Sequence, residues 1–153
     1  MHIKNKVQME SQNMNEKKPS GIPSWLRWLP AISYAGLIFV ASSIPQPIPE
    51  IPIPYIDKPI HFIEYAILCL LLCWPHSANT PGPPEADTAQ GESTWPIKKV
   101  VLFSIVAASL YGASDEIHQY FVPGRCCEFS DWVSDTLGAS FAGFLWYRRK
   151  VSP

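Results

Sequence analysis

The sequence lacks several features that would assign it to a common functional class. Its 153 residues carry 12 basic and 13 acidic side chains, a net charge of −1, so nucleic-acid binding has no electrostatic support. None of its four cysteines forms a CxxC pair, which leaves zinc-ribbon and thioredoxin-like sites without support. The chain also has no GxSxG nucleophile motif, no nucleotide or coenzyme A loop and no internal repeat. The sequence therefore requires no cofactor.

The four cysteines fall into two pairs of different character. Cys69 and Cys73 are four residues apart in an apolar run, which favours buried packing on one helix face over a binding site. Cys126 and Cys127 are adjacent in an expected loop, where they could oxidise with another thiol. The redox state of this second pair stays open.

Four long apolar blocks dominate the rest of the chain. The charged residues lie mainly outside these blocks, so the mean hydropathy is only slightly positive. Each block approaches the roughly 20 residues that a membrane-spanning helix requires. We therefore predict an all-α, polytopic membrane protein with four transmembrane helices in a bundle, and the lipid bilayer is its first expected partner. The expected helices cover about 26–44, 59–75, 97–122 and 131–147.

Polar and proline-rich segments separate these blocks. Residues 1–24 form a polar tail, five prolines between 45 and 54 predict extended chain, and 76–96 read as a polar linker. Pro75 is expected to end the second helix. Small residues at 40–43 leave a cleaved signal peptide as an alternative for the first block, but the long polar stretch before it favours a retained helix.

The basic residues predict the orientation in the membrane. The tail, the linker side and the C-terminus are rich in Lys and Arg, whereas the other two connections contain only Lys58 and Arg125. By the positive-inside rule, both termini and the linker are expected in the cytoplasm. The two connections that contain Lys58 and Arg125 are then outside.

Polar side chains from three segments are expected at this outer membrane face. They lie at the start of the second helix, at the end of the third and at the start of the fourth. Ionisable groups at membrane depth are costly and must face one another or a water-filled cavity. Hydrogen bonds of His61 with Asp115, or of Glu64 with His118, are the suggested pairings. The candidate catalytic residues are His61, Glu64, Asp115, Glu116 and His118, and the candidate ligand-binding residues are Lys58, Gln119, Arg125, Asp131 and Asp135.

Several interpretations of this cluster stay open. It could be a polar lock between helices or a binding site in which Lys58 and Arg125 hold an anionic group of a lipid-borne ligand. It could also be an acid–base or metal site, because imidazole and carboxylate suit Zn, Fe or Mn. Whether the protein is an enzyme, and whether it binds a metal, is not decided by the residues. Small residues at 138, 139, 142 and 143 indicate close packing of the last helix.

Three stretches of sequence resemble the VanZ-like family of bacterial membrane proteins, which is named after a teicoplanin-resistance protein. The stretches are Asp57–Tyr65 (DKPIHFIEY), Tyr111 with Asp115–Arg125 (DEIHQYFVPGR), and Asp131–Gly138 (DWVSDTLG). The resemblance covers roughly residues 29–147, and it departs from the family pattern at Cys126–Cys127 and in the long linker.

The resemblance implies a small multi-pass protein of the cell envelope, located in the bacterial cytoplasmic (inner) membrane, with residues 25–150 as a VanZ-like membrane domain. The polar tail, residues 1–24, lies outside the resemblance. It implies a relation to glycopeptide (teicoplanin) resistance and a cell-surface, cell-wall or lipid-linked ligand. A membrane-embedded hydrolase or transferase that uses the His/Asp/Glu cluster is the alternative, and a structural partner of a larger complex is a third. The motif positions carry over as His61, Glu64, Asp115, Glu116, His118, Gln119, Arg125, Asp131 and Asp135.

Overall fold

The computed structural model describes residues 23–45, 57–77 and 95–152, and these residues form helices and turns without a strand. A short 3-10 helix, η1 (Ser24–Trp28), leads into α2 (Leu29–Ser42). The other helices are α3 (Asp57–Ser77), α4 (Ile97–Gln119) and α5 (Phe129–Val151). The all-α prediction with four long helices is confirmed. Most of the predicted tail, the proline-rich connection and the polar linker lie outside the described residues.

Two helix ends differ from the prediction. Pro75 does not end α3, which continues to Ser77. A proline removes one intrahelical hydrogen bond. Because only two residues of the helix follow Pro75, this loss disrupts little of the helix. In α4 the regular helix ends at Gln119 rather than at 122, because Phe121 and Val122 donate to carbonyls three residues back. Such tighter turns are common at helix ends, where the last backbone groups lack i→i−4 hydrogen-bond partners.

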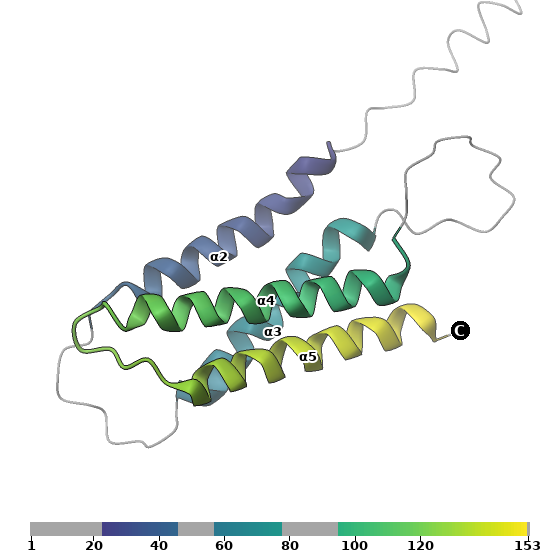
Figure 1. The fold of residues 1–153 in the computed structure, drawn as a ribbon. Coiled ribbons are helices and arrows are strands. Elements are labelled where there is room, and N and C mark those ends of the chain that lie inside the picture. Colours follow the sequence, from purple (N-terminus) through teal and green to yellow (C-terminus); the bar gives the residue numbers. More distant parts are fainter. Residues whose placement is uncertain (1–22, 46–56, 78–94, 153) are drawn as a thin grey trace, which may run out of the picture.

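The four helices alternate in direction (Figure 1). The starts of α2 and α4 and the ends of α3 and α5 lie at one end of the bundle, and the opposite helix ends lie at the other. The helix ends that adjoin the tail, the linker and the C-terminus therefore share one end, as the sequence predicts. The assignment of that end to the cytoplasm remains a prediction.

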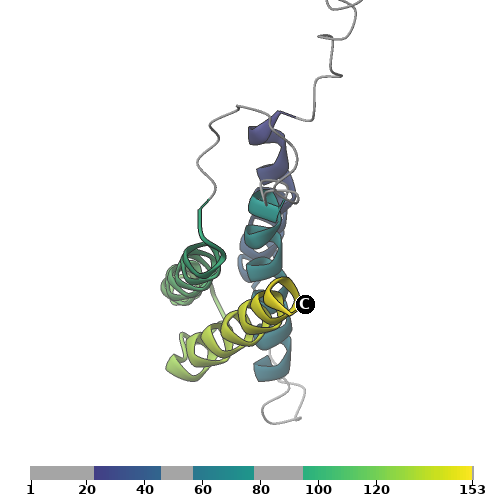
Figure 2. The same cartoon turned by 90° about the vertical axis from the view of Figure 1, so that its right-hand side faces the viewer.

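Helix α3 is the centre of the bundle. It packs most extensively on α5, α4 packs on both, and α2 makes the smallest contacts with α3 and α4; Figure 2 shows the same arrangement turned by 90°. The core contains Tyr65, Ala108 and Ala139, all fully buried. Cys69 and Cys73 are also fully buried there, as their spacing predicts, while Cys126 and Cys127 are exposed.

Three of the described helical segments are long and apolar enough to cross a membrane: Trp25–Ser42, Asp57–His76 and Ile97–Gln119. Their outer faces carry large apolar side chains, for example Leu37 (65% exposed) and Leu110 (66% exposed). Exposed apolar surface on this scale is what a lipid bilayer would cover. The chain is therefore a multi-pass membrane protein.

Helix α5 does not meet the same hydropathy criterion, although it has 23 residues. Its low mean comes partly from the basic residues of its last turn and partly from Asp131 and Asp135, which are buried. Its outer face is apolar, with Leu137, Phe141 and Phe144 each more than half exposed. The mean hydropathy of α5 is therefore low even though its outer face is compatible with lipid, because the helix also supplies polar groups to the interior.

Candidate functional site

Buried polar side chains gather at one end of the bundle, where α2 and α4 end and α3 and α5 begin. They come from all four helices, and most of the residues singled out from the sequence are among them. The buried ones at this end are Ser42, His61, Asp115, Glu116, Gln119, Asp131 and Asp135. The structure thus brings together groups that are far apart in the sequence, within what we call the polar site.

The centre of the polar site is a hydrogen bond between α3 and α5. Nδ1 of His61 lies 2.9 Å from Oδ1 of Asp135, which is fully buried. The other ring nitrogen, Nε2, lies 4.0 Å from Oδ2 of Asp131. The pairing of His61 with Asp115 suggested from the sequence is wrong, because α3 packs chiefly on α5 and Asp115 instead faces α2.

Asp115 and His118 serve the contact between α4 and α2. Asp115 accepts hydrogen bonds from the Ser42 hydroxyl (2.7 Å) and the Gln119 amide (2.9 Å). His118 pairs with the Ser43 hydroxyl (2.9 Å) and stacks on the Phe39 ring. The suggested pairing of His118 with Glu64 is therefore wrong. Asp115, His118 and Gln119 are three and four residues apart and therefore share one face of α4, which is turned toward α2.

Glu64 lies between these two groups. It is partly buried, one turn along α3 from His61, and it is close enough to His61, Asp115 and Asp135 for electrostatic interaction. Its position agrees with the prediction that it belongs to the site, but within the described residues no hydrogen bond assigns Glu64 a role.

Lys58 is held by three carboxylates at the rim of the polar site. Its ammonium forms ion pairs with Asp57 (2.9 Å), with Glu128 (2.7 Å) and with the buried Asp131. The Lys58 ammonium keeps the pKa of the Glu128 carboxyl below its ordinary value. An anionic ligand group at Lys58 would have to exchange with these internal partners.

Arg125 is likewise bound within the chain. Its guanidinium donates to the carbonyls of Ala41 (2.8 Å) and Ile44 (3.3 Å), which are at the end of α2. Cations at a helix C-terminus stabilise the free carbonyls there. The geometry therefore gives Arg125 a structural role in fixing α2, while its predicted ligand role stays untested.

Sequence reasoning missed the contributions of Ser42, Ser43 and Glu128. In the sequence the two serines are noted only as small residues near a potential cleavage site. Polar residues at the end of an apolar helix are, however, a signal for interhelical hydrogen bonds. Besides binding Lys58, Glu128 donates its backbone N–H to Glu116 Oε2 (2.9 Å). A contact between positions 58 and 128 has no local signature in the sequence.

Among the residues that the structure describes, two groups of side chains have the composition of a metal site. His61, Glu116 and Asp135 each offer a ligand atom, and these atoms lie within 4.8 Å of one another. Asp57, Glu128 and Asp131 meet the same criterion, but these three are the carboxylates that pair with Lys58. The chemistry available to the polar site is thus that of imidazole and carboxylate: proton transfer, cation binding and hydrogen bonding to hydroxyl or amine groups.

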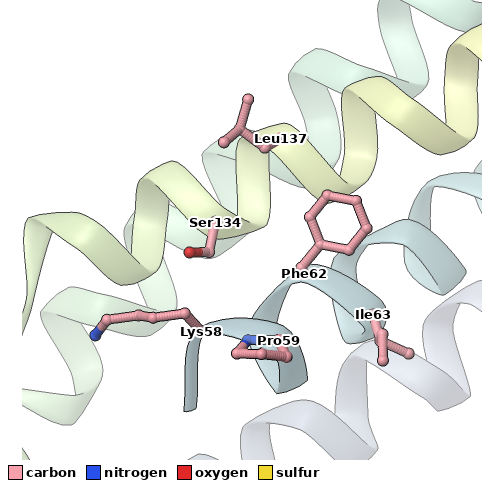
Figure 3. Close-up of a pocket in the computed structure, with 6 residues that line it drawn as sticks. All are labelled: Lys58, Pro59, Phe62, Ile63, Ser134 and Leu137. Atoms are coloured by element: carbon pink, nitrogen blue, oxygen red, sulfur yellow. The ribbon is translucent and has the colours of Figure 1, made fainter. Parts of the chain in front are cut away.

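An apolar groove runs beside the polar site between α3 and α5 (Figure 3). Pro59, Phe62 and Ile63 of α3 line it opposite Leu137 of α5, and Lys58 and Ser134 complete it. Its volume is about 510 Å³. Because Lys58 belongs both to this groove and to the carboxylate cluster, the groove adjoins the polar site.

Comparison with known families gives one assignment. The family model described as VanZ/LLP1 matches residues 4–150, a longer stretch than the motifs alone cover. Comparisons with curated proteins and with solved structures gave no significant match. The family match spans nearly the whole chain and agrees with the helical membrane fold and with the motif resemblance. The chain therefore belongs to the VanZ/LLP1 family.

Proposed function

We propose that this protein resides in the bacterial cytoplasmic membrane with the polar site at the outer face. There it binds a lipid-linked ligand of the cell envelope and thereby lowers susceptibility to glycopeptides such as teicoplanin. The observation that carries the proposal is the position of Lys58, which belongs both to the apolar groove and to the carboxylate cluster. A lipid-linked ligand has the matching two-part chemistry.

The groove suits the hydrocarbon part of such a ligand. It lies on apolar helix faces that a bilayer would surround, and its volume is within the range of roughly 300–1,000 Å³ typical of ligand sites. The polar part of the ligand would then reach Lys58 and Ser134. Because three carboxylates surround Lys58, hydroxyl or amine groups suit this end better than a bare anion.

The test is teicoplanin susceptibility of a sensitive Gram-positive host that carries the empty vector, the parent protein or a variant at matched membrane levels. We expect protection by the parent, and loss of protection with His61→Ala and with Leu137→Trp, which fills the groove. Leu102→Trp is the matched control, because Leu102 is an exposed leucine (63%) on α4 outside the groove. It should protect as the parent does.

The outcomes separate the parts of this proposal. If the parent gives no protection, the glycopeptide role is rejected. If the parent protects and Leu137→Trp protects equally, the ligand does not use the groove. Binding of a purified lipid-linked cell-wall precursor to the detergent-solubilised protein, weakened by Leu137→Trp but not by Leu102→Trp, would support the ligand class directly.

The second candidate function is that of a membrane-embedded hydrolase or transferase. It is favoured by the hydrogen bond that orients His61 through Asp135, because a histidine held by a buried carboxylate is suited to act as a general base. Turnover of the lipid-linked precursor by the purified parent, lost in Asp135→Asn while binding persists, would support catalysis. Binding without turnover would leave the protein a binding protein.

A further inference from the structure

One imidazole and two carboxylates converge from three helices in the interior of the polar site. His61 comes from α3, Glu116 from α4 and Asp135 from α5, and one ligand atom of each lies within 4.8 Å of the others. Glu116 is 4% exposed and Asp135 is fully buried. Helices that are separate in the sequence thus place three metal-ligating groups around one point.

Two carboxylate oxygens of this group have no donor. Oε1 of Glu116 and Oδ2 of Asp135 are buried and accept no hydrogen bond from the described residues. A buried polar atom without a partner is costly, and an uncompensated charge is more so, especially at membrane depth. These oxygens are independent evidence that the cluster takes a ligand, and the ligand they require is a cation or a donor.

In the neighbouring carboxylate cluster, a lysine of the chain itself neutralises the acidic side chains. There the Lys58 ammonium is bound by Asp57, Glu128 and Asp131. Among the described residues, neither Lys58 nor Arg125 contacts His61, Glu116 or Asp135, since Arg125 donates to carbonyls of α2. Within the described residues, a protonated His61 is the cation that pairs with Asp135. It cannot also bind both Oε1 of Glu116 and Oδ2 of Asp135.

We propose that His61, Glu116 and Asp135 form a binding site for a divalent transition-metal ion. Zn²⁺ and Mn²⁺ fit this mixture of imidazole and carboxylate, whereas Mg²⁺ and Ca²⁺ prefer oxygen ligands alone. Asp131 is placed to supply a fourth ligand, because its Oδ2 lies 4.0 Å from Nε2 of His61. The ion would neutralise the buried carboxylates and join α3, α4 and α5.

This site is independent of the proposed lipid-linked ligand, because metal binding is measured without any cellular activity. Failure of the susceptibility test leaves the metal proposal standing, and absence of metal leaves the lipid proposal standing. The metal also differs from the anion-binding role suggested for Lys58 and Arg125, since its three main ligands are His61, Glu116 and Asp135, whereas Lys58 pairs with Asp57, Glu128 and Asp131.

The experiment is Zn²⁺ binding by the purified full chain in detergent, with Cys126 and Cys127 changed to serine because exposed adjacent thiols bind Zn²⁺ themselves. After chelator treatment, equilibrium dialysis in excess Mg²⁺ should give about one tightly bound Zn²⁺ per chain. His61→Ala, Glu116→Gln and Asp135→Asn should each weaken binding at least about tenfold.

His118→Ala is the matched control, because His118 lies at the same end of the bundle but pairs with Ser43 and Phe39 on the α2 side. It should bind Zn²⁺ as the parent does. Circular dichroism and size-exclusion profiles identify any variant that fails to fold. X-ray absorption of the zinc-loaded parent gives a result that needs no variant: oxygen and nitrogen ligands that include imidazole.

Three results would overturn the proposal. The first is the absence of saturable Zn²⁺ binding near one ion per chain in the parent. The second is a folded His61→Ala protein that binds Zn²⁺ as tightly as His118→Ala does. The third is an absorption spectrum without an imidazole ligand.

Discussion

A β-carbon at Gly138 would lie 2.0 Å from the backbone carbonyl oxygen of Phe62, so α3 and α5 are in direct backbone contact at this point. The contact is next to the centre of the polar site, because Phe62 follows His61 and Gly138 is three residues after Asp135. Helices that approach this closely in a membrane do so at small residues. The glycine thus fixes the interhelical distance at which His61 reaches Asp135.

Replacement of Gly138 by alanine should therefore destabilise the bundle. The added methyl group meets backbone atoms, which cannot rotate away, so α3 and α5 must separate. Overpacking of this kind costs about 1–3 kcal/mol. We expect a lower thermal unfolding midpoint for Gly138→Ala in detergent, measured by circular dichroism.

Gly143→Ala is the control on the same helix. Its β-carbon would meet side-chain atoms rather than backbone: Cδ1 (2.8 Å) and Cγ1 (2.9 Å) of Ile105 and Cγ1 of Val101 (3.2 Å). Side chains can shift more easily than a helix backbone. We expect a clearly smaller loss of stability than for Gly138→Ala. Equal losses in the two variants would contradict the assignment of backbone contact to position 138.

Gly112 provides the space that the Asp135 carboxylate occupies. A β-carbon at Gly112 would lie 2.6 Å from Oδ2 of Asp135, so Gly112→Ala should displace that carboxylate and break its hydrogen bond with His61. Nitrogen NMR of histidine-labelled protein should report the loss as a changed Nδ1 signal of His61, and Zn²⁺ binding should weaken with it.

Gly36→Ala is the matched control for this effect, because nothing lies within 4 Å of a β-carbon at Gly36. It should leave the His61 signal and the Zn²⁺ affinity unchanged. An unchanged His61 signal in a folded Gly112→Ala protein would show that Asp135 can be displaced without loss of its pairing, and the glycine would then have no part in the site.

Much of the fold could be predicted from the sequence because membrane helices are marked by long apolar runs. The four helices and the burial of Cys69 and Cys73 follow from such local patterns. The shared depth of the polar groups follows from alternation of direction along the chain. Helix ends are less predictable: the sequence predicts a stop at Pro75, but the helix tolerates this proline in its last residues.

The pairings within the site could not be predicted, because they depend on which helices are neighbours. The sequence does not indicate that α3 packs chiefly on α5. This packing places His61 within hydrogen-bond distance of Asp135 rather than of Asp115. In the same way, Lys58 and Arg125 look like free cations in the sequence. Their partners, Glu128 and the carbonyls of α2, are 70 or more positions away along the chain.

Lys58→Met should release the loop before α5. Without the ammonium, Asp57, Glu128 and Asp131 repel one another, and the pKa of Glu128, which Lys58 lowers, should rise toward its ordinary value. In the parent the Lys58–Glu128 pair should persist above the ordinary Glu pKa and be lost as the pH falls through the lowered one. Hydrogen exchange of residues 126–130 should be faster in the variant.

Lys98→Met removes an exposed lysine at the opposite end of the bundle and serves as the control for Lys58→Met. It should leave hydrogen exchange in residues 126–130 as in the parent. If the two lysine variants exchange equally slowly there, the Lys58 ion pairs do not hold the loop.

Arg125→Ala should loosen the end of α2, because the carbonyls of Ala41 and Ile44 lose their shared donor. Helix α2 has the smallest contacts in the bundle, so it depends on this link more than the other helices would. We expect faster hydrogen exchange at the α2 C-terminus, with only partial recovery in Arg125→Lys, since one ammonium cannot reproduce the guanidinium fork. If α2 exchange is unchanged in Arg125→Ala but binding of the lipid-linked precursor is lost, Arg125 is a ligand residue and its contacts with α2 are secondary.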